Sequence, residues 1–441
     1  MSLAAPLAPA PHPVRRPSRP LVVGIDFGTS NSAAALIDAN GHLQVVPLDA
    51  ERHEMPSAVF FASETHSVHF GSEAMRAYLS GTEGRLMRSL KSLLGSALID
   101  EFTNVNGQAL RFFDILVLFF RELKRRCELH AGVPLTYAML GRPVHFVDDD
   151  PVRDAQAQAT LGKAAREAGF EHIAYQLEPI AAALDYEQRV QTEMHALVVD
   201  IGGGTSDFTV IRLHPKRVSV TDRSADILAT AGIHIGGTDF DRLLDLSNVM
   251  PLLGYKHIGT GGRPVPNSVF FNLSTWHLIH HAYTRKAMHF AKELWADYGN
   301  AHLHRRLMLA LEEQHGHRML AAVERAKISC SARSESAAID LNFLDDALVS
   351  QLTAADMAQV LQTAIEQVVQ CAQSCVAKSG LSRVDAVYLT GGSSALRPLL
   401  DALARAMPDC EQVQGDRFGS VAAGLAYCGA VQAAQGDGFA S

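Results

Sequence analysis

Two short segments of this chain combine an aspartate with a glycine-rich turn, a pairing suited to binding a metal-bound polyphosphate. The first, residues 24–31, reads GIDFGTSN, and the second, residues 199–207, reads VDIGGGTSD. Backbone N–H groups at such a turn form an anion-binding nest, and glycine lets a phosphate approach the backbone closely. Asp26 and Asp200 would repel a bare phosphate but suit Mg²⁺, which favours carboxylates and water. The candidate phosphate ligands are Gly28, Thr29, Ser30, Gly202, Gly203, Gly204 and Thr205.

The alternative is that both segments are ordinary glycine hairpin turns, which recur widely in proteins. Their repetition argues against this, because each copy occupies the same place in one half of the chain. Two copies indicate two similarly folded halves rather than a solenoid array.

A third feature is Glu178, which precedes Pro179 and an alanine run. Proline suits the first position of a helix and keeps the preceding residue extended. A carboxylate held there could orient a water that attacks a γ-phosphate. The alternative is an acid favoured only by the helix dipole. Farther on, LTGGSS at 389–394 could place a ribose against bare backbone, although alone it is an ordinary turn between strand and helix.

Alternation of strand-like and helix-like runs predicts an α/β fold. Predicted strands include 21–25, 33–37, 43–46, 58–61, 136–140, 173–177, 196–201, 208–213 and 218–222. Helices are predicted near 85–94, 115–131, 152–168 and across a histidine-rich block at about 240–330. We expect one lobe at 21–194, with a subdomain near 57–130, and a second at 195–441, with a helical subdomain near 242–325.

Composition narrows the classes of function. The net charge of −8 and the lack of a dense Lys/Arg stripe argue against a nucleic-acid partner. No apolar run is long enough to span a bilayer. Residues 1–20, rich in Pro and Ala, are expected to be a disordered tail. The six cysteines show no paired spacing, which indicates a reducing, cytoplasmic setting.

The motifs occur in the same order as in the DnaK-type seventy-kilodalton heat-shock chaperones. The chain therefore resembles this family, and most closely its short YegD-type bacterial proteins. The hairpins and Glu178–Ala183 contribute, as do IGGTDFD at 235–241, VERAK at 323–327 and TGGS at 390–393. The resemblance covers about 21–434 apart from 245–320, and implies the actin-like ATPase fold with Mg·ATP or Mg·ADP between two lobes.

The resemblance also implies roles for individual residues. Asp26 and Asp200 would hold hydrated Mg²⁺, while Glu178, Asp200 and Thr205 would position the attacking water. The phosphates would contact the two glycine turns, including Asn31. The adenosine would be surrounded by Gly236, Gly237, Glu324, Lys327, Ser331, Gly391, Gly392 and Ser393.

The chain departs from the family at several positions. Met75 stands where the family's catalytic lysine is expected after FGSEA, with Arg76 or Lys91 as alternative cations. Ile328 and Ala395 stand where the family places arginines near adenine. Loss of a cation beside the γ-phosphate would reduce hydrolysis more than binding.

The block from 245 to 320 is longer than the family's corresponding segment, and its histidines include those at 277, 280, 281, 289, 302, 304, 315 and 317. A metal site is one interpretation and solvated helix surface is the other. A partner surface or a lid over the cleft would also explain the insertion.

These observations predict a slow ATPase or nucleotide-driven switch, read by an unknown protein partner or co-chaperone. They predict no peptide-binding domain within this sequence. A non-hydrolysing nucleotide-binding scaffold is the alternative, and a small-molecule kinase or a filament rests on analogy of fold alone.

Overall fold

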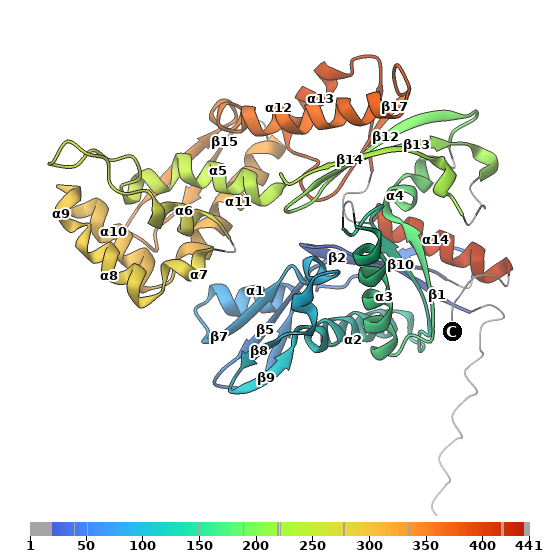
Figure 1. Cartoon of the computed structure of the whole chain (residues 1–441), viewed down its shortest axis with the longest axis horizontal. Helices are drawn as coiled ribbons and strands as arrows, with labels where there is room; N and C mark the ends of the chain where they lie inside the picture. The colour runs from blue at the N-terminus through green and yellow to red at the C-terminus, as the bar shows by residue number, and fades with distance from the viewer. Residues whose placement is uncertain are drawn as a thin grey trace, which may run out of the picture.

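The computed structural model describes residues 20–435, except for 39, 51, 148–149, 188, 218–219, 221, 277, 334 and 416–418. The tail predicted at 1–20 therefore lies almost wholly outside the described residues. The described chain contains two large β-sheets, each with five strands hydrogen-bonded in series and with helices beside it (Figure 1). The predicted α/β class is confirmed.

The first sheet has the order β11–β10–β1–β2–β3, with β4 also paired to β2. Strand β1 is antiparallel to β2 and parallel to β10, which is parallel to β11. Apolar residues on both faces of β1 are buried, as expected for a strand covered on two sides. The strands are β1 Val22–Phe27, β2 Asn31–Ile37, β3 Leu43–Val45, β4 Glu54–Pro56, β10 Tyr137–Arg142 and β11 His172–Leu177.

The second sheet repeats this plan in the order β14–β13–β12–β17–β18. Its first three strands are antiparallel, and its last two join in parallel, as in the first sheet. The strands are β12 Met194–Ile201, β13 Ser206–Leu213, β14 Ile227–Ile233, β17 Ala386–Thr390 and β18 Glu411–Gln414. The third strand is thus Ile227–Ile233. The strand predicted at 218–222 falls partly outside the described residues, and no strand is assigned at its described positions.

A smaller sheet, in the order β6–β5–β7, lies beside α1 and a β8–β9 hairpin in the first half of the chain. The helix predicted near 85–94 is wrong, because Gly84–Arg88 pairs antiparallel with β5 and is followed by a short 3₁₀ turn. Tertiary pairing has overridden local preference here. The elements are β5 Ala58–Ala62, β6 Val68–Phe70, α1 Gly71–Leu79, β7 Gly84–Arg88, η1 Leu90–Leu93, η2 Ala97–Asp100, β8 Phe102–Val105 and β9 Gln108–Arg111.

Three helices follow in the first half. Helix α2 spans Phe112–Ala131, and its buried face of Phe, Ile and Leu packs into the same core as β1. Helix α3 spans Pro151–Glu167, with Asp150 capping its first turn through the Arg153 N–H. Helix α4 spans Glu178–Glu187 and begins directly after β11.

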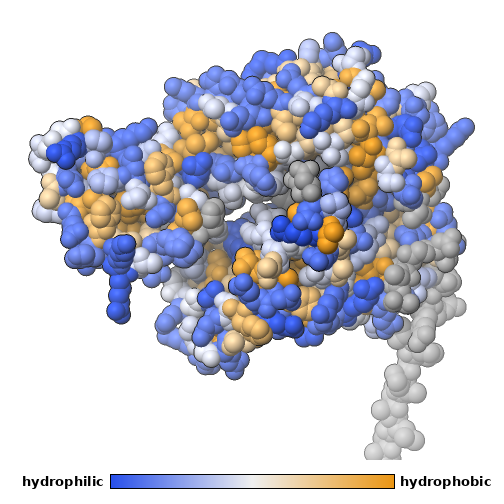
Figure 2. Space-filling view, in the orientation of Figure 1, coloured by the Kyte–Doolittle hydropathy of each residue, from blue (hydrophilic) through white to orange (hydrophobic). Residues whose placement is uncertain are grey.

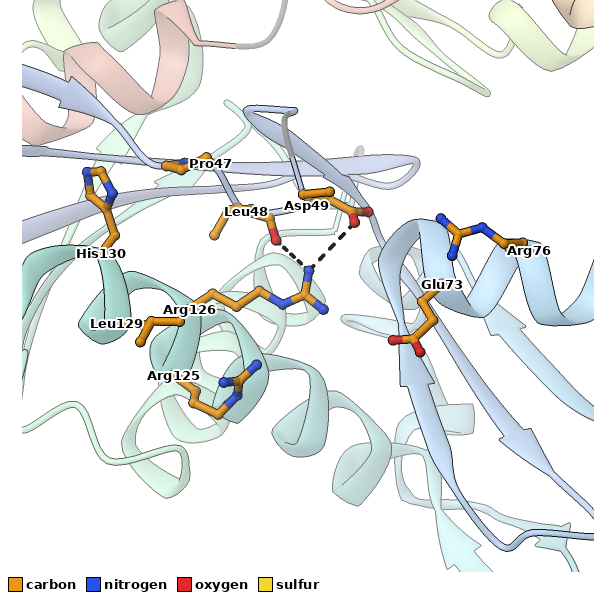
Figure 3. Close-up of a pocket in the computed structure, with 10 residues that line it drawn as sticks. Pro47, Leu48, Asp49, Glu73, Arg76, Arg125, Arg126, Leu129 and His130 are labelled. Atoms are coloured by element: carbon orange, nitrogen blue, oxygen red, sulfur yellow. Dashed lines mark hydrogen bonds and ion pairs between the residues drawn. The ribbon is translucent and has the colours of Figure 1, made fainter.

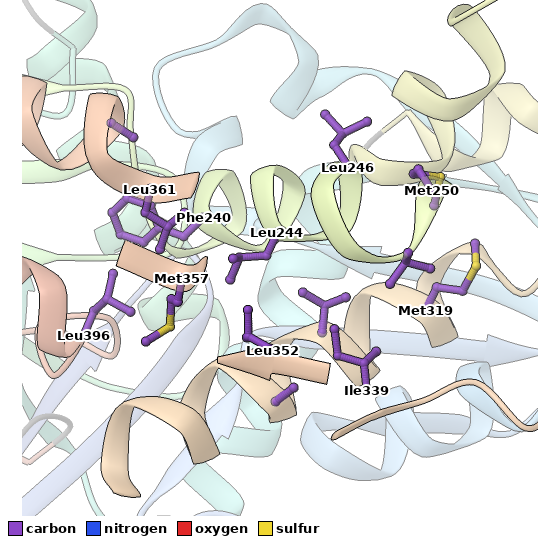
Figure 4. Close-up of a cluster of buried hydrophobic side chains, with 14 of the residues drawn as sticks. Phe240, Leu244, Leu246, Met250, Met319, Ile339, Leu352, Met357, Leu361 and Leu396 are labelled. Atoms are coloured by element: carbon purple, nitrogen blue, oxygen red, sulfur yellow. The ribbon is translucent and has the colours of Figure 1, made fainter. Parts of the chain in front are cut away.

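The histidine-rich block is helical, as predicted. Its core is continuous with that of the second sheet, and Phe240, Leu244 and Met319 lie within it (Figure 4). Together with short turns η3 Pro215–Arg217, η4 Ser224–Asp226 and η5 Met250–Leu253, the elements are α5 Gly237–Asn248, α6 Ser268–Ser274, α7 Ile279–Ala282, α8 Arg285–Glu293, α9 Trp295–Tyr298, α10 Ala301–Glu312 and α11 Gly316–Arg333. Strands β15 Ser336–Asp340 and β16 Val349–Thr353 follow, with α12 Ala354–Lys378 and α13 Arg397–Ala406.

Helix α14, Ser420–Gln435, returns to the first sheet and packs against β1 and α4 (Figure 1). The approach is close because the facing residues are small. A β-carbon added at Gly424 would lie 1.9 Å from the Ala181 carbonyl oxygen, and one at Gly24 would lie 2.4 Å from the Ala426 nitrogen. Small residues on both surfaces therefore allow the backbones to come together.

Candidate nucleotide site

The two glycine hairpins meet tip to tip. One hairpin joins β1 to β2 and the other joins β12 to β13. A β-carbon added to Gly203 would lie 2.0 Å from Ser30 Oγ, so the second hairpin approaches the first without room for a side chain. The backbone N–H of Gly202 donates to the Thr205 carbonyl at 2.9 Å and closes the second turn. The predicted phosphate ligands are thus brought together from both halves.

Three carboxylates converge beside these hairpins. Burial, followed by the charge of Glu178, raises the pKa of Asp26 to about 8, and Asp200 adds to the shift. Burial, Asp207 and Glu178 raise the pKa of Asp200 to about 7. These raised pKa values indicate that Asp26 and Asp200 are shielded from water and have too little positive charge near them to stabilise their ionised forms. A cation would relieve this repulsion.

Lys91 supplies part of that counter-charge. Its Nζ donates to Glu178 Oε1 at 2.8 Å, and both side chains are 13% exposed. Burial acts to lower the pKa of Lys91, but the charges of Glu178, Asp26 and Asp200 more than offset this and leave it raised. The lysine is held in place by η1, which follows Ser89 in the left-handed region (φ 57°).

Of the residues considered from sequence for the cation of this site, Lys91 lies in it, whereas Met75 packs elsewhere. Met75 lies on α1 and packs against the apolar cluster that includes Ala58 and Phe60. The cation comes instead from Lys91, one of the two alternatives considered from sequence. One signal could have found it: Lys91 is the first lysine of the chain, and the next is Lys124.

The Gly236–Gly237 turn lies against the second hairpin. The Gly237 N–H donates to the Gly202 carbonyl at 3.0 Å, and the Thr238 N–H donates to the Gly203 carbonyl at 2.7 Å. A β-carbon on Gly237 would lie 2.3 Å from Ser393 Oγ, which joins this turn to the TGGS segment.

The predicted adenosine residue Lys327 has a structural partner. Its Nζ lies 2.8 Å from Asp241 Oδ1 and 3.3 Å from the Gly237 carbonyl, which accepts a hydrogen bond. Burial raises the pKa of Asp241 to about 6, although Lys327 opposes the shift. Lys327 therefore ties α11 to the start of α5 and fixes the Gly236–Gly237 turn.

The TGGS segment closes the same side of the site. Gly391 has φ +84°, and a β-carbon there would lie 2.3 Å from Asp200 Oδ1. Ser331 Oγ donates to the Ala395 carbonyl at 2.9 Å and accepts from the Arg397 N–H at 2.8 Å, so α11 holds the following turn. On α11, Glu324 is exposed and Ile328 is 57% exposed. An apolar surface therefore stands where sequence comparison expected an arginine.

Two histidines of the insertion, His304 and His317, have separate partners, and His277 lies outside the described residues. His304 Nε2 and the Ala291 carbonyl are 2.9 Å apart, and His317 contacts Tyr78 and Trp276. Among the described residues, no three His, Cys, Asp or Glu side chains are grouped so that they could hold a metal ion. This applies equally to the three carboxylates.

A separate cavity of about 510 Å³ lies between α1, α2 and the turn at 47–50 (Figure 3). Arg126 on one wall already donates to the Leu48 carbonyl and to Glu122. Arg125 is paired with Glu122 as well. Apart from Arg76, which the sequence offered as an alternative cation, the cavity shares none of the predicted site residues.

Comparison with known proteins identifies the family. The family model described as "Hsp70 protein" matches residues 22–112 and 101–248, and the chain belongs to this family, which implies the actin-like ATPase fold. It is similar to the proteins named "Chaperone protein DnaK" from Thermotoga neapolitana and Thermosipho africanus, each 33% identical over 227 residues. The protein of that name from Thermotoga maritima is 32% identical. Each match covers 51% of this chain and 35% of the relative, so the chain spans about a third of these relatives' length in the matched region. Within the part of the chain described here, no helix combines the length and apolarity needed to cross a membrane.

Proposed function

We propose that this chain binds ATP with Mg²⁺ between two lobes, hydrolyses it slowly, and signals the nucleotide state to a protein partner through lobe closure. Each lobe is built on one of the two sheets. The observation that carries the proposal is the meeting of Ser30 with Gly203, because it brings one anion-binding turn from each half to one place. The free cysteines of the described chain suit the cytoplasm as the place of action.

Each part of the site would have one task. The hairpin backbones and the hydroxyls of Thr29, Ser30 and Thr205 would bind the phosphates. Glu178, with Asp200 and Thr205, would orient the attacking water. Lys91 would stabilise negative charge as the γ-phosphate leaves, which is the task that sequence comparison had assigned to a missing lysine. Thr205 Oγ1 donates to Asp207 Oδ2 at 2.9 Å in the structure, so its hydroxyl is already oriented.

Asp26, Asp200 and Glu178 form an acid cluster whose negative charge suits the binding of Mg²⁺. Asp26 and Asp200 have raised pKa values because burial and neighbouring carboxylates disfavour their charged forms. A hydrated Mg²⁺ held by these two residues would supply positive charge that neutralises the phosphates. The two carboxylates would hold this ion through its waters, which suits an ion that dehydrates reluctantly.

The base would lie between α11 and the TGGS segment. Gly391 is partly exposed and Gly392 is exposed there, with Gly236 and Gly237 buried behind them, and Ile328 offers an apolar face to a purine. Lys327 and Ser331 act on this pocket by holding its walls, given their contacts with Asp241 and the Ala395 carbonyl. Ser393, opposite Gly237, would lie near the ribose.

The non-hydrolysing scaffold loses its main support, because that alternative depended on Met75 replacing the lysine. Lys91 beside Glu178 gives hydrolysis a charged group in the expected role. The partner that reads lobe closure is proposed as a protein, because the insertion, which is longer than the family's corresponding segment, would offer it a surface.

Calorimetric titration with Mg·ATP and Mg·ADP, followed by a single-turnover phosphate-release assay, tests the proposal. We expect binding by the wild type and slow release of phosphate. Asp200→Asn should lose Mg²⁺-dependent binding, while Asp346→Asn, at an exposed acid outside the site, should retain it. Equal affinity in all three proteins would refute the proposed site. Binding without phosphate release over hours would favour the scaffold.

A further inference from the structure

Strand β15 has one free edge. Among the described strands it pairs only with β16, and the two run antiparallel. The Ala354 N–H donates to the Glu335 carbonyl at 3.0 Å, so the bonds between these strands fall at the odd-numbered residues of β15. The backbone N–H and C=O groups of Ser336, Ala338 and Asp340 therefore point away from β16. An edge of this kind can accept a further strand.

A groove of about 300 Å³ follows this edge and separates it from α11. We call it the edge groove. Its helix side carries Arg325, Ser329 and Arg333, which succeed one another at intervals of one turn on one side of α11. Its strand side is made by residues from both faces of β15, namely Ser336, Ala337, Ala338 and Asp340. The edge groove therefore presents free backbone groups on one wall and guanidinium groups on the other.

The edge groove carries an excess of positive charge. Arg325 and Arg333 are exposed, and neither forms an ion pair or a side-chain hydrogen bond within the part of the chain that the structure describes. Among the described residues that line the groove, Asp340 is the single acid, and its Oδ1 accepts from the Asn342 N–H at 3.0 Å. Guanidinium groups bind carboxylates through charge-assisted hydrogen bonds. The groove therefore suits an acidic occupant.

The spacing of the two arginines specifies an extended occupant. From Arg325 to Arg333 the helix rises by about 12 Å. Side chains four positions apart on a strand lie on the same face and are separated by about 13 Å. Acids at the first and fifth positions of a strand paired with β15 would therefore reach the two guanidinium groups. The residue at the third position would lie beside Ser329.

A second copy of this chain would fit the same edge poorly. Helix α11 packs against β15 itself, and paired strands lie only about 4.8 Å apart. Pairing of two β15 edges would bring their two α11 helices closer than the roughly 8–10 Å that packed helices require. A free segment of a partner carries no such helix, so it can lie alongside α11.

Figure 2 shows hydrophilic and hydrophobic residues intermixed over the part of the surface where β15 and α12 lie in Figure 1. Backbone hydrogen bonds and charge, rather than a broad apolar face, would therefore supply the affinity. We propose that the edge groove binds an extended acidic segment of a partner protein, which joins β15 as a third strand and places acids four positions apart on Arg325 and Arg333. This inference goes beyond the proposed function and does not depend on nucleotide binding.

Fluorescence polarisation in the absence of nucleotide tests the proposed segment. The probe is a labelled synthetic peptide of sequence TEVSVET, whose two glutamates lie four positions apart. TQVSVQT removes both charges, and TEVSEVT places the glutamates on opposite faces of a strand. Both control peptides should bind at least about tenfold more weakly than the probe, because each loses charge-assisted hydrogen bonds. Equal affinity for the three peptides would overturn the proposal, as would a lack of binding with protein at up to about 200 µM.

Reversal of charge tests the helix wall of the edge groove. The double variant Arg325→Glu with Arg333→Glu should lose binding of TEVSVET and gain binding of TKVSVKT, because the charges exchange sides. The matched control is Arg285→Glu, at an exposed arginine of α8, which should bind TEVSVET as the wild type does. If the double variant is folded by circular dichroism and fails to bind TKVSVKT, the assignment of the two arginines is refuted.

Ala338→Pro tests the strand wall separately. It removes an N–H that faces the groove, a change that an edge strand tolerates, and should weaken binding of TEVSVET at least about tenfold while both arginines remain. Sedimentation velocity of the wild type over about a hundredfold range of concentration detects the competing occupant. Self-association that Ala338→Pro abolishes would show that a second copy takes the edge, and would overturn the partner segment while leaving the nucleotide proposal intact.

Discussion

Lys91 Nζ donates to Glu178 Oε1 at 2.8 Å, and this pair joins the 3₁₀ turn after the small sheet to the start of α4. The two residues lie beside Asp26 and Asp200, whose charges act on the lysine. A buried lysine among three carboxylates can neutralise only part of their charge. With all three carboxylates ionised the site would carry a net negative charge, which a metal ion would balance.

Replacement of Lys91 tests its role in chemistry. Lys91→Met should slow single-turnover phosphate release by a factor on the order of 10² or more, since a preorganised charge beside the leaving phosphate acts mainly in the transition state. Affinity for Mg·ATP should change much less. The control is Lys216→Met, at an exposed lysine. Met75→Lys should not raise turnover, because Met75 packs in an apolar cluster. Faster turnover in Met75→Lys would contradict the position assigned here to the cation.

The junction of the hairpins is tested with two neighbouring glycines. Gly203→Ala would place a β-carbon 2.0 Å from Ser30 Oγ and should force the hairpins apart, lowering affinity for Mg·ADP at least tenfold. Gly204→Ala is the matched control, because a β-carbon there meets nothing within 4 Å. Adding Ser30→Gly to Gly203→Ala should restore part of the affinity by removing the clash. Equal calorimetric affinities for the two alanine variants would argue against the meeting of the hairpins.

The acid cluster predicts a pH dependence of stability without metal. Because folding raises the pKa of Asp26 to about 8 and of Asp200 to about 7, the folded state binds protons more tightly than the unfolded chain. Their contribution to stability is therefore greatest below about pH 4 and is lost as pH rises toward 7 to 8. Each group contributes at most about 1.4 kcal/mol per pH unit within that window.

Urea unfolding between pH 5 and 8 measures this slope. Mg·ADP should flatten it, and Asp200→Asn should reduce it in the metal-free protein. A metal-free slope that is identical in the wild type and Asp200→Asn would contradict the raised pKa of Asp200.

Asp241 and Asp245 lie one turn apart on α5, and their removal should change the free energy of unfolding in opposite directions. Both carboxyl oxygens of Asp245 are buried without a hydrogen-bond partner among the described residues, and burial raises its pKa well above the usual range. Asp245→Val should therefore raise the free energy of unfolding by about 1–3 kcal/mol. Asp241→Val would leave Lys327 buried without its partner and should lower that free energy by about 3–5 kcal/mol. Urea melts would decide, and destabilisation by Asp245→Val would show that this carboxyl has an unseen partner such as water.

The sequence predicted the hairpins well because each is a local pattern whose glycines, hydroxyls and aspartate lie within eight or nine residues. Lys91 was harder, since its position depends on the pairing of Gly84–Arg88 with β5, a long-range contact that local preference contradicted. The contact of Lys327 with Asp241 was also hidden, because it joins residues 86 positions apart. Tyr78 and His317 gave no sequence signal of their contact, as only the fold brings them together.

Helix α14 has a consequence for the way the protein is made. The strand that begins at Val22 is covered by a helix that begins at Ser420, and Gly429 of that helix packs against Val22 itself. A nascent chain would therefore expose one face of its first sheet until nearly all of the described sequence had left the ribosome. The local elements of the amino-terminal half would form before α14 is synthesised. Because one face of the first sheet would stay uncovered during that time, this half would need protection from aggregation during translation.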